Sequence, residues 1–103
     1  MAEAGPDRDA VVALLREHEA MLRAMGVQHL AIFGSRARGD HTRESDIDML
    51  IDVVDTSRFS LLDLVGVERI VTDRTGIASN AIMRRSLDSD FRAAITADVV
   101  EVF

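Results

Sequence analysis

Two aspartates, two residues apart, are the side chains in this sequence best placed to do chemistry. Asp46 and Asp48 open a segment in which apolar and acidic residues alternate. In a strand, residues at this spacing point to the same face, about 6 to 7 Å apart. Two carboxylates so placed can share one or two Mg²⁺ ions that also contact substrate phosphates. The pair therefore predicts a divalent-cation site.

A glycine-serine turn lies ten residues before this pair. Gly34 allows close approach of a phosphate to the backbone, and Ser35 supplies a hydroxyl at the start of a predicted helical turn over residues 35–38. Arg36 and Arg38 can add bidentate phosphate contacts. Each feature alone is common at protein surfaces, but a phosphate loop after one strand and carboxylates opening the next meet at one edge of a sheet. The combination predicts a site for a metal-bound phosphate compound.

The elements that must position these residues can be read from apolar periodicity and capping residues. A helix over residues 7–25 and strands over residues 27–33 and 47–53 precede a helix that starts after Ser60 and ends near Gly76. The remainder predicts a strand over 77–83, a short helix over 88–97 with Phe91 and Ile95 facing inward, and a final strand over 99–103. This order predicts an α/β sandwich with a small mixed sheet flanked by helices.

The composition describes one small globular domain over residues 1–103, because 48% of the residues are hydrophobic and the length suffices for a single core. The chain has no cysteine, so thiolate metal sites and cysteine nucleophiles are excluded, and the cytoplasm is the expected location. All 12 basic residues are arginine, which excludes a Walker-type or Schiff-base lysine. No apolar run is long enough to predict a membrane span.

The charge is acidic overall and unevenly distributed. A net charge of −6 disfavours the wrapping of nucleic acid, which needs many basic contacts to phosphates. Residues 34–45 carry three arginines against two acidic residues, whereas residues 46–63 carry five aspartates against one arginine. A small basic turn thus precedes an acidic strand, an arrangement that suits a metal-bridged nucleotide.

The pattern of Gly34-Ser35, ten intervening residues and Asp46-Ile47-Asp48 resembles the signature of the DNA-polymerase-β nucleotidyltransferase superfamily. Residues 33–52 are similar to its smallest branch, the minimal nucleotidyltransferases or MNT domains. The resemblance implies that Gly34 and Ser35 hold the phosphates of ATP and that Asp46 and Asp48 bind Mg²⁺ or Mn²⁺. It also implies nucleotidyl transfer by two-metal displacement.

Many members of this branch are antitoxins that silence a HEPN-domain toxin by transferring AMP to a tyrosine of it. The resemblance therefore implies a HEPN-type partner and a hetero-oligomer. The chain contains no tyrosine, so it cannot modify itself at such a residue. The N-terminal helix and residues 99–103 are the expected places for an apolar face that contacts the partner.

One position departs from the family pattern. A third carboxylate normally completes the site, and the matching position on the strand over 77–83 is Asn80. Asparagine cannot carry negative charge or take up the acceptor's proton. Asp52 is the nearest substitute in sequence, but it lies about 13 Å from Asp48 along a strand. Asp73 is expected at the end of a helix.

Asn80 leaves two readings open: an enzyme with a retained nucleotide and metal site, or a binding module that neutralises its partner by occlusion. A third reading is a small-molecule transferase of the antibiotic-modifying kind, which usually needs an additional domain. His41, in the loop before the aspartates, is more simply read as a surface residue than as a nucleotide contact.

Overall fold

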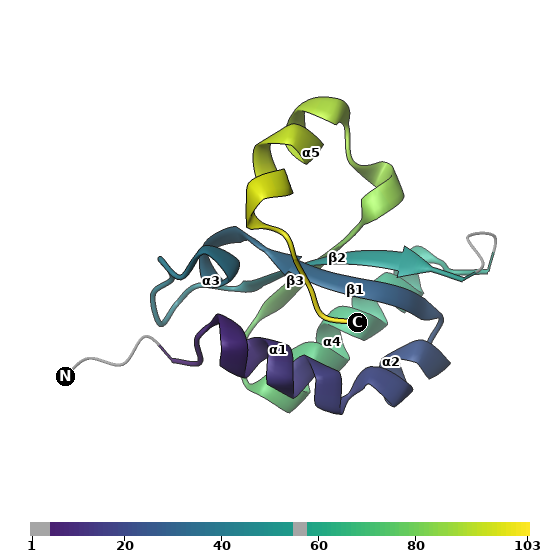
Figure 1. Ribbon diagram of the computed structural model, residues 1–103. Helices are drawn as coiled ribbons and strands as arrows, with labels where there is room; N and C mark the ends of the chain where they lie inside the picture. Colours follow the sequence, from purple (N-terminus) through teal and green to yellow (C-terminus); the bar gives the residue numbers. More distant parts are fainter. Residues whose placement is uncertain (1–4, 55–57) are drawn as a thin grey trace.

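The protein, represented by a computed structural model that describes residues 5–54 and 58–103, is built on a mixed sheet in the order β3-β2-β1-β4 (Figure 1). Strand β1 runs antiparallel to β2 and β4, whereas β2 and β3 are parallel. The strands are β1 (Val27–Phe33), β2 (Ile47–Val53), β3 (Ser79–Met83) and β4 (Val100–Glu101). The expected small mixed sheet with flanking helices is confirmed.

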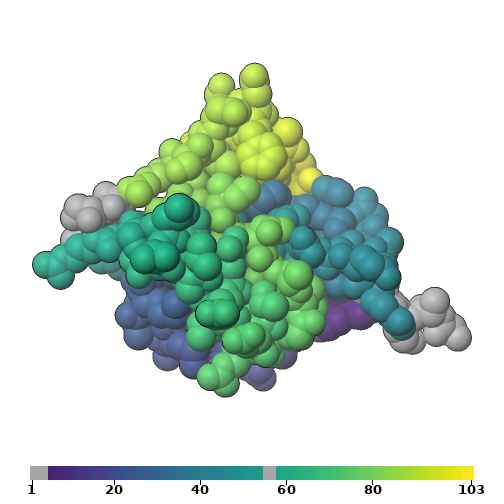
Figure 2. Space-filling model, turned by 180° about the vertical axis from the view of Figure 1, so that it is seen from behind, coloured from purple at the N-terminus to yellow at the C-terminus, as the bar shows by residue number. Residues whose placement is uncertain are grey.

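The helices are distributed unequally over the two faces of the sheet. Helices α1 (Arg8–Glu17), α2 (Glu19–Ala24) and α4 (Leu61–Thr75) lie against one face, and α5 (Ser89–Ile95) stands on the other (Figure 1). Seen from behind, the C-terminal segment that contains α5 rises as a narrow peak above the body of the molecule (Figure 2). The short helix α3 (Gly34–Arg38) directly follows β1.

The alternation in β2 determines which face carries the acidic residues. Ile47, Met49 and Ile51 are fully buried in the main core, together with residues of α1 and α4. Leu50 instead joins a smaller cluster on the opposite face with residues of β1 and α5. Because Asp48 and Leu50 are two residues apart, Asp48 shares the face that α5 covers only in part.

The predicted helix over residues 7–25 is wrong in one respect, because it is interrupted at His18. There the backbone leaves helical geometry, with φ −106° and ψ 14°, and the His18 N–H donates to the carbonyl of Leu15, three residues back. This tighter turn bends the chain between α1 and α2. Both Leu15 and Leu22 remain fully buried across the bend, so packing against the sheet compensates for the broken helix.

Other boundaries follow their capping residues. Ser60 and Asp63 form the expected capping box of α4, and Gly76 ends that helix with φ +74°. The third and fourth strands are shorter than predicted, and α5 is followed by a 3₁₀ turn, Thr96–Asp98. Phe91 was expected to face inward, but it is 39% exposed and touches Phe33 only edge to face.

The expected exposed apolar face is not found on the N-terminal helix or at residues 99–103. Val11 and Leu15 of α1 and Val102 near the C-terminus are buried in the core. The large apolar side chains that are exposed in the described ranges lie elsewhere, mostly at the start of α4: Val54, Leu61, Leu62, Val65 and Phe91. No helix in residues 5–54 and 58–103 is long and apolar enough to cross a membrane.

Candidate active site

Strand pairing brings the three candidate catalytic residues to one end of the sheet. Asp48 stands opposite Phe33 of antiparallel β1 and opposite Asn80 of parallel β3. Gly34, directly after Phe33, therefore lies beside Asp48, and Asp46 precedes β2 on the same side. The tertiary structure thus brings together the glycine turn, both aspartates and Asn80, although residues 46 and 80 are far apart in sequence.

Gly34 is required at its position by two independent features. Its φ is +79°, a conformation that residues with a Cβ rarely adopt. A Cβ on residue 34 would also overlap Oδ2 of Asp48, so the carboxylate packs directly against the glycine backbone. The glycine turn and Asp48 are therefore one packed unit.

Gly34→Ala is expected to destabilise the fold by more than Gly76→Ala. Gly76 has nearly the same φ, +74°, but open space where a Cβ would lie, so it isolates the backbone strain of about 1 to 2 kcal/mol. Overlap with Asp48 should add about 1 to 3 kcal/mol at Gly34. Urea denaturation of both variants measures the difference.

The added cost should disappear when Asp48→Ala removes the overlapping carboxylate, so a double-mutant cycle on Gly34 and Asp48 isolates the contact. Equal destabilisation by Gly34→Ala and Gly76→Ala would show that Gly34 serves only its backbone conformation.

Asn80 links the two aspartates. Its Nδ2 donates a hydrogen bond to Oδ2 of Asp46 at 3.0 Å and a longer one to Oδ1 of Asp48 at 3.5 Å. The amide therefore places partial positive charge between two carboxylates that repel each other. A divalent cation between the same oxygens would neutralise them more fully.

The surroundings of Asp48 disfavour its charge. Burial raises the pKa of Asp48 above its usual value of 3.8, and the neighbouring charge of Asp46 raises it further. The hydrogen bond from Asn80 and the charge of Arg38 act in the opposite direction without cancelling the rise. An ionised carboxylate that is poorly solvated and faces a second carboxylate favours binding of a cation.

The donor set fits Mg²⁺ with two protein carboxylates and leaves its other ligand positions to phosphates and water. No group of three or more acidic, histidine or cysteine side chains suited to a metal occurs in the described part of the chain. Asp52 does not supply a third carboxylate here, since it pairs with Arg84 at 3.1 Å. The oxygen of the Asn80 amide could act as a ligand only if the amide turned over from its present orientation.

Arg36 is not exposed to solvent, as a residue that contacts phosphate would be. Its side chain is buried, and its guanidinium donates to the carbonyls of Ser45, Pro6 and Thr42 at 3.0, 2.7 and 3.4 Å. It thus holds the loop that leads to Asp46. Periodicity did not reveal this role, because the three acceptors are backbone atoms.

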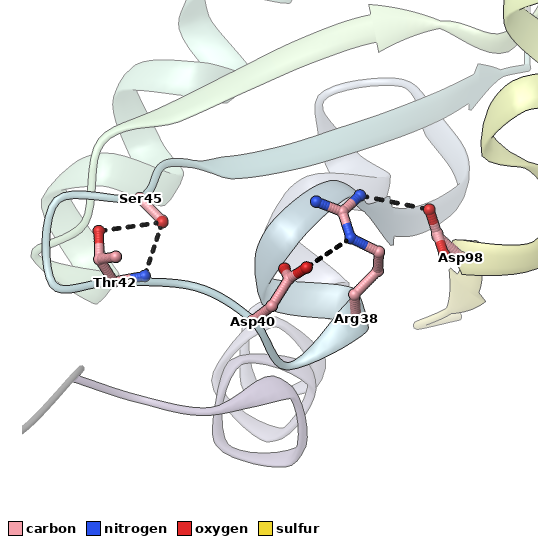
Figure 3. A network of polar contacts seen from close by, with 5 residues as sticks. All are labelled: Arg38, Asp40, Thr42, Ser45 and Asp98. Atoms are coloured by element: carbon pink, nitrogen blue, oxygen red, sulfur yellow. Dashed lines mark hydrogen bonds and ion pairs between the residues drawn. The ribbon is translucent and has the colours of Figure 1, made fainter.

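Arg38 lies at the exposed edge of the site. Its guanidinium bridges Asp40 at 3.1 Å and Asp98 at 3.3 Å, which ties α3 to the turn after α5 (Figure 3). These hydrogen bonds raise the pKa of Arg38. Ser35 is half-buried, and its carbonyl accepts from the N–H groups of Gly39 and Asp40. In the same loop, Nδ1 of His41 is buried without a hydrogen-bond partner among the described residues.

Sequence reasoning also missed Glu68 of α4, which supports the strand that carries Asn80. Its Oε2 accepts the N–H of Ala81 at 2.7 Å, and its carbonyl accepts the hydroxyl of Ser79 at 2.9 Å. Because β3 is at the edge of the sheet, these bonds satisfy groups on both sides of Asn80. Glu68 lies on a helix whose sequence shows only an apolar stripe, and this pattern does not indicate that its side chain contacts β3.

Comparison with known proteins agrees with this fold. Residues 15–98 match the nucleotidyltransferase domain family, and because the match spans most of the sequence, the chain belongs to that family. Its relatives include the protein adenylyltransferase MntA of Thermococcus cleftensis. The two sequences are 30% identical over 95 residues, which cover 91% of this chain and 94% of MntA.

Solved structures share the fold. A chain in the crystal structure of a toxin–antitoxin with AMP-PNP superposes with a TM-score of 0.70 at 18% identity, covering 85% of this chain and 72% of that one. A chain in the structure of a tri-AMPylated Shewanella oneidensis HEPN toxin in complex with MNT antitoxin superposes with a TM-score of 0.64 at 15% identity. The match covers 89% of this chain and 71% of that one. At these identities the likeness concerns the fold alone.

Proposed function

We propose that this protein is a protein adenylyltransferase that transfers AMP from ATP to a hydroxyl group of a HEPN-type toxin and acts as its antitoxin in a cytoplasmic complex. The observation that carries the proposal is the arrangement at one end of the sheet, where Asp48 packs against Gly34 and Asn80 joins Asp48 to Asp46. Membership of the nucleotidyltransferase family and the 30% identity to the protein adenylyltransferase MntA support it.

In the proposed reaction, the acceptor oxygen bonds to the α-phosphorus of ATP and its proton passes to solvent, while the bond from that phosphorus to the α,β-bridging oxygen breaks and pyrophosphate leaves. Gly34 and Ser35 receive the phosphates, and Arg38 contributes positive charge at the edge of the site. Asp46 and Asp48 hold Mg²⁺, which when bound neutralises charge on the entering and leaving oxygens. Asn80 holds the two carboxylates but cannot take the proton released by the acceptor.

The test is a transfer assay with the purified chain, a co-encoded HEPN protein, Mg²⁺ and ATP labelled at the α-phosphate. Label is expected on the HEPN protein, and Asp46→Asn should reduce it at least about a hundredfold, because the cation loses one of two protein ligands. ATP labelled at the γ-phosphate is the control and should leave the protein unlabelled, which distinguishes AMP transfer from phosphorylation.

A second candidate, an antitoxin that acts by binding alone, is favoured by one observation: an asparagine stands where the family pattern has a third carboxylate. In this case, Asp46→Asn would still form the complex on size exclusion and still silence the toxin, and the wild-type chain would transfer no label. That result would contradict the enzyme proposal.

A further inference from the structure

We infer that Arg36 is a positioning residue that fixes the main chain at Asp46 and so sets the cation affinity of the site, rather than a ligand of the nucleotide phosphates. The inference rests on the proposed function only in taking Asp46 as a cation ligand. Its basis is the burial of Arg36, which is 2% exposed, and the three backbone carbonyls that its guanidinium contacts.

Asp46 depends on its neighbours in the chain more than Asp48 does. Asp48 lies within β2 and is paired with a strand on each side, whereas Asp46 is exposed and precedes the first residue of β2. On its C-terminal side, the chain is held by the hydrogen bond from Ile47 N–H to the Ala78 carbonyl at 2.9 Å. Its N-terminal side needs a comparable anchor.

Arg36 supplies that anchor through the Ser45 carbonyl. This carbonyl and the N–H of Asp46 belong to the same planar peptide unit, so the 3.0 Å bond from Arg36 Nε fixes the orientation of that unit. The Thr42 carbonyl, which Arg36 Nη2 also contacts, accepts from Ser45 N–H at 3.1 Å. Ser45 Oγ in turn accepts from Thr42 N–H, which closes the turn (Figure 3).

The third contact connects this loop to the N-terminal segment. Nη1 of Arg36 donates to the Pro6 carbonyl at 2.7 Å, and the next residue, Asp7, is the N-cap of α1. One planar guanidinium therefore joins α3, the loop before β2 and the start of α1. A buried side chain with its donors directed to three carbonyls has little capacity left for a phosphate.

The test compares Arg36→Lys with Arg36→Met. Mn²⁺ is titrated into each purified chain and its binding is measured by electron paramagnetic resonance, with no toxin present and no AMP transfer required. Lysine keeps the charge but cannot span three carbonyls with a planar fork. Both variants are therefore expected to bind Mn²⁺ about 10 to 100 times more weakly than the wild type, which is the usual loss when a residue that positions a metal ligand is removed. If Arg36 instead binds phosphate by charge, Arg36→Lys should retain the wild-type Mn²⁺ affinity.

A matched control is Arg16→Lys, since Arg16 Nε also donates to a backbone carbonyl, that of Val102 at 2.9 Å, away from the site. Its Mn²⁺ affinity should be unchanged. In an Asp46→Asn background, Arg36→Lys should weaken Mn²⁺ binding no further, because the ligand that it positions is already lost.

If Arg36 variants fail to fold, Ser45→Ala decides, because it removes only the hydroxyl that closes the same turn. A weakened Mn²⁺ affinity in this variant supports the inference, and an unchanged affinity overturns it. Full Mn²⁺ affinity in a folded Arg36→Lys chain overturns the inference alone. A wild-type chain that binds no Mn²⁺, with or without ATP, overturns the proposed function as well.

Discussion

Asp48→Asn is expected to lower AMP transfer about a thousandfold or more while raising the melting temperature of the metal-free protein at neutral pH. The loss of transfer follows because a catalytic cation contributes several kcal/mol, and about 4 kcal/mol corresponds to a thousandfold. Asparagine has nearly the same shape and can still accept the hydrogen bond from Asn80. The two effects therefore separate the carboxylate's charge from its packing.

The stability change follows from the raised pKa of Asp48, which is due first to burial and then to Asp46. In the folded protein this carboxyl retains its proton at pH values where the unfolded chain has lost it. The contribution of the Asp48 carboxyl to the stability of the fold is therefore complete below its ordinary pKa of 3.8. It is lost as the pH rises through the higher pKa that this carboxyl has in the folded protein. The neutral variant avoids this loss.

Melting temperatures of wild type and Asp48→Asn should accordingly converge at a pH below 3.8 and diverge at neutral pH. Saturating Mg²⁺ should stabilise the wild type more than the variant, because only the wild type keeps both carboxylates. A variant that is less stable than the wild type at neutral pH without metal would show that Asp48 is favourably ionised in the folded state.

The matched control is Asp52→Asn, on the same strand and the same face as Asp48. Asp52 pairs with Arg84 rather than with the site, and Arg84 keeps a second carboxylate partner in Glu101. AMP transfer by Asp52→Asn should equal that of wild type. Equal losses at both positions would indicate a general effect of acidic residues on this face.

Asn80→Asp is expected to increase AMP transfer about a hundredfold. The aspartate would stand opposite Asp48 in the parallel register and provide the basic group that asparagine lacks. Positioned bases contribute about 10² to 10⁴-fold, and the lower end applies because Asn80 already holds the aspartates in place. Single-turnover transfer of α-labelled AMP to the HEPN protein measures the gain.

The same substitution should weaken the metal-free fold. It replaces the amide donor between Asp46 and Asp48 with a third negative charge, so the melting temperature should fall without Mg²⁺ and recover when Mg²⁺ is added. Asn80→Ala is the control, since it removes the amide without adding a base and should give no gain. No gain from Asn80→Asp would mean that two carboxylates suffice for this chain.

Features decided within a few residues of the sequence were predictable. Alternation along β2 placed Asp48 on the face opposite the main core, and the capping box at Ser60 set the start of α4. The glycine-serine turn and the paired aspartates were recognisable for the same reason, because their spacing is set by the strand and turn that contain them. The interruption of the helix at His18 was not predictable, since it depends on how α1 and α2 pack on the sheet.

Contacts between distant residues required the tertiary structure. Nothing near Arg36 in the sequence shows whether its side chain is buried and donates to three carbonyls or is exposed and binds phosphate. The hydrogen-bond partners of Arg36 are backbone atoms that folding brings near it. The bridge from Asn80 to both aspartates likewise depends on the register of β2 and β3. Local periodicity thus determined the elements and the carboxylate pair, whereas long-range packing decided what holds that pair in position.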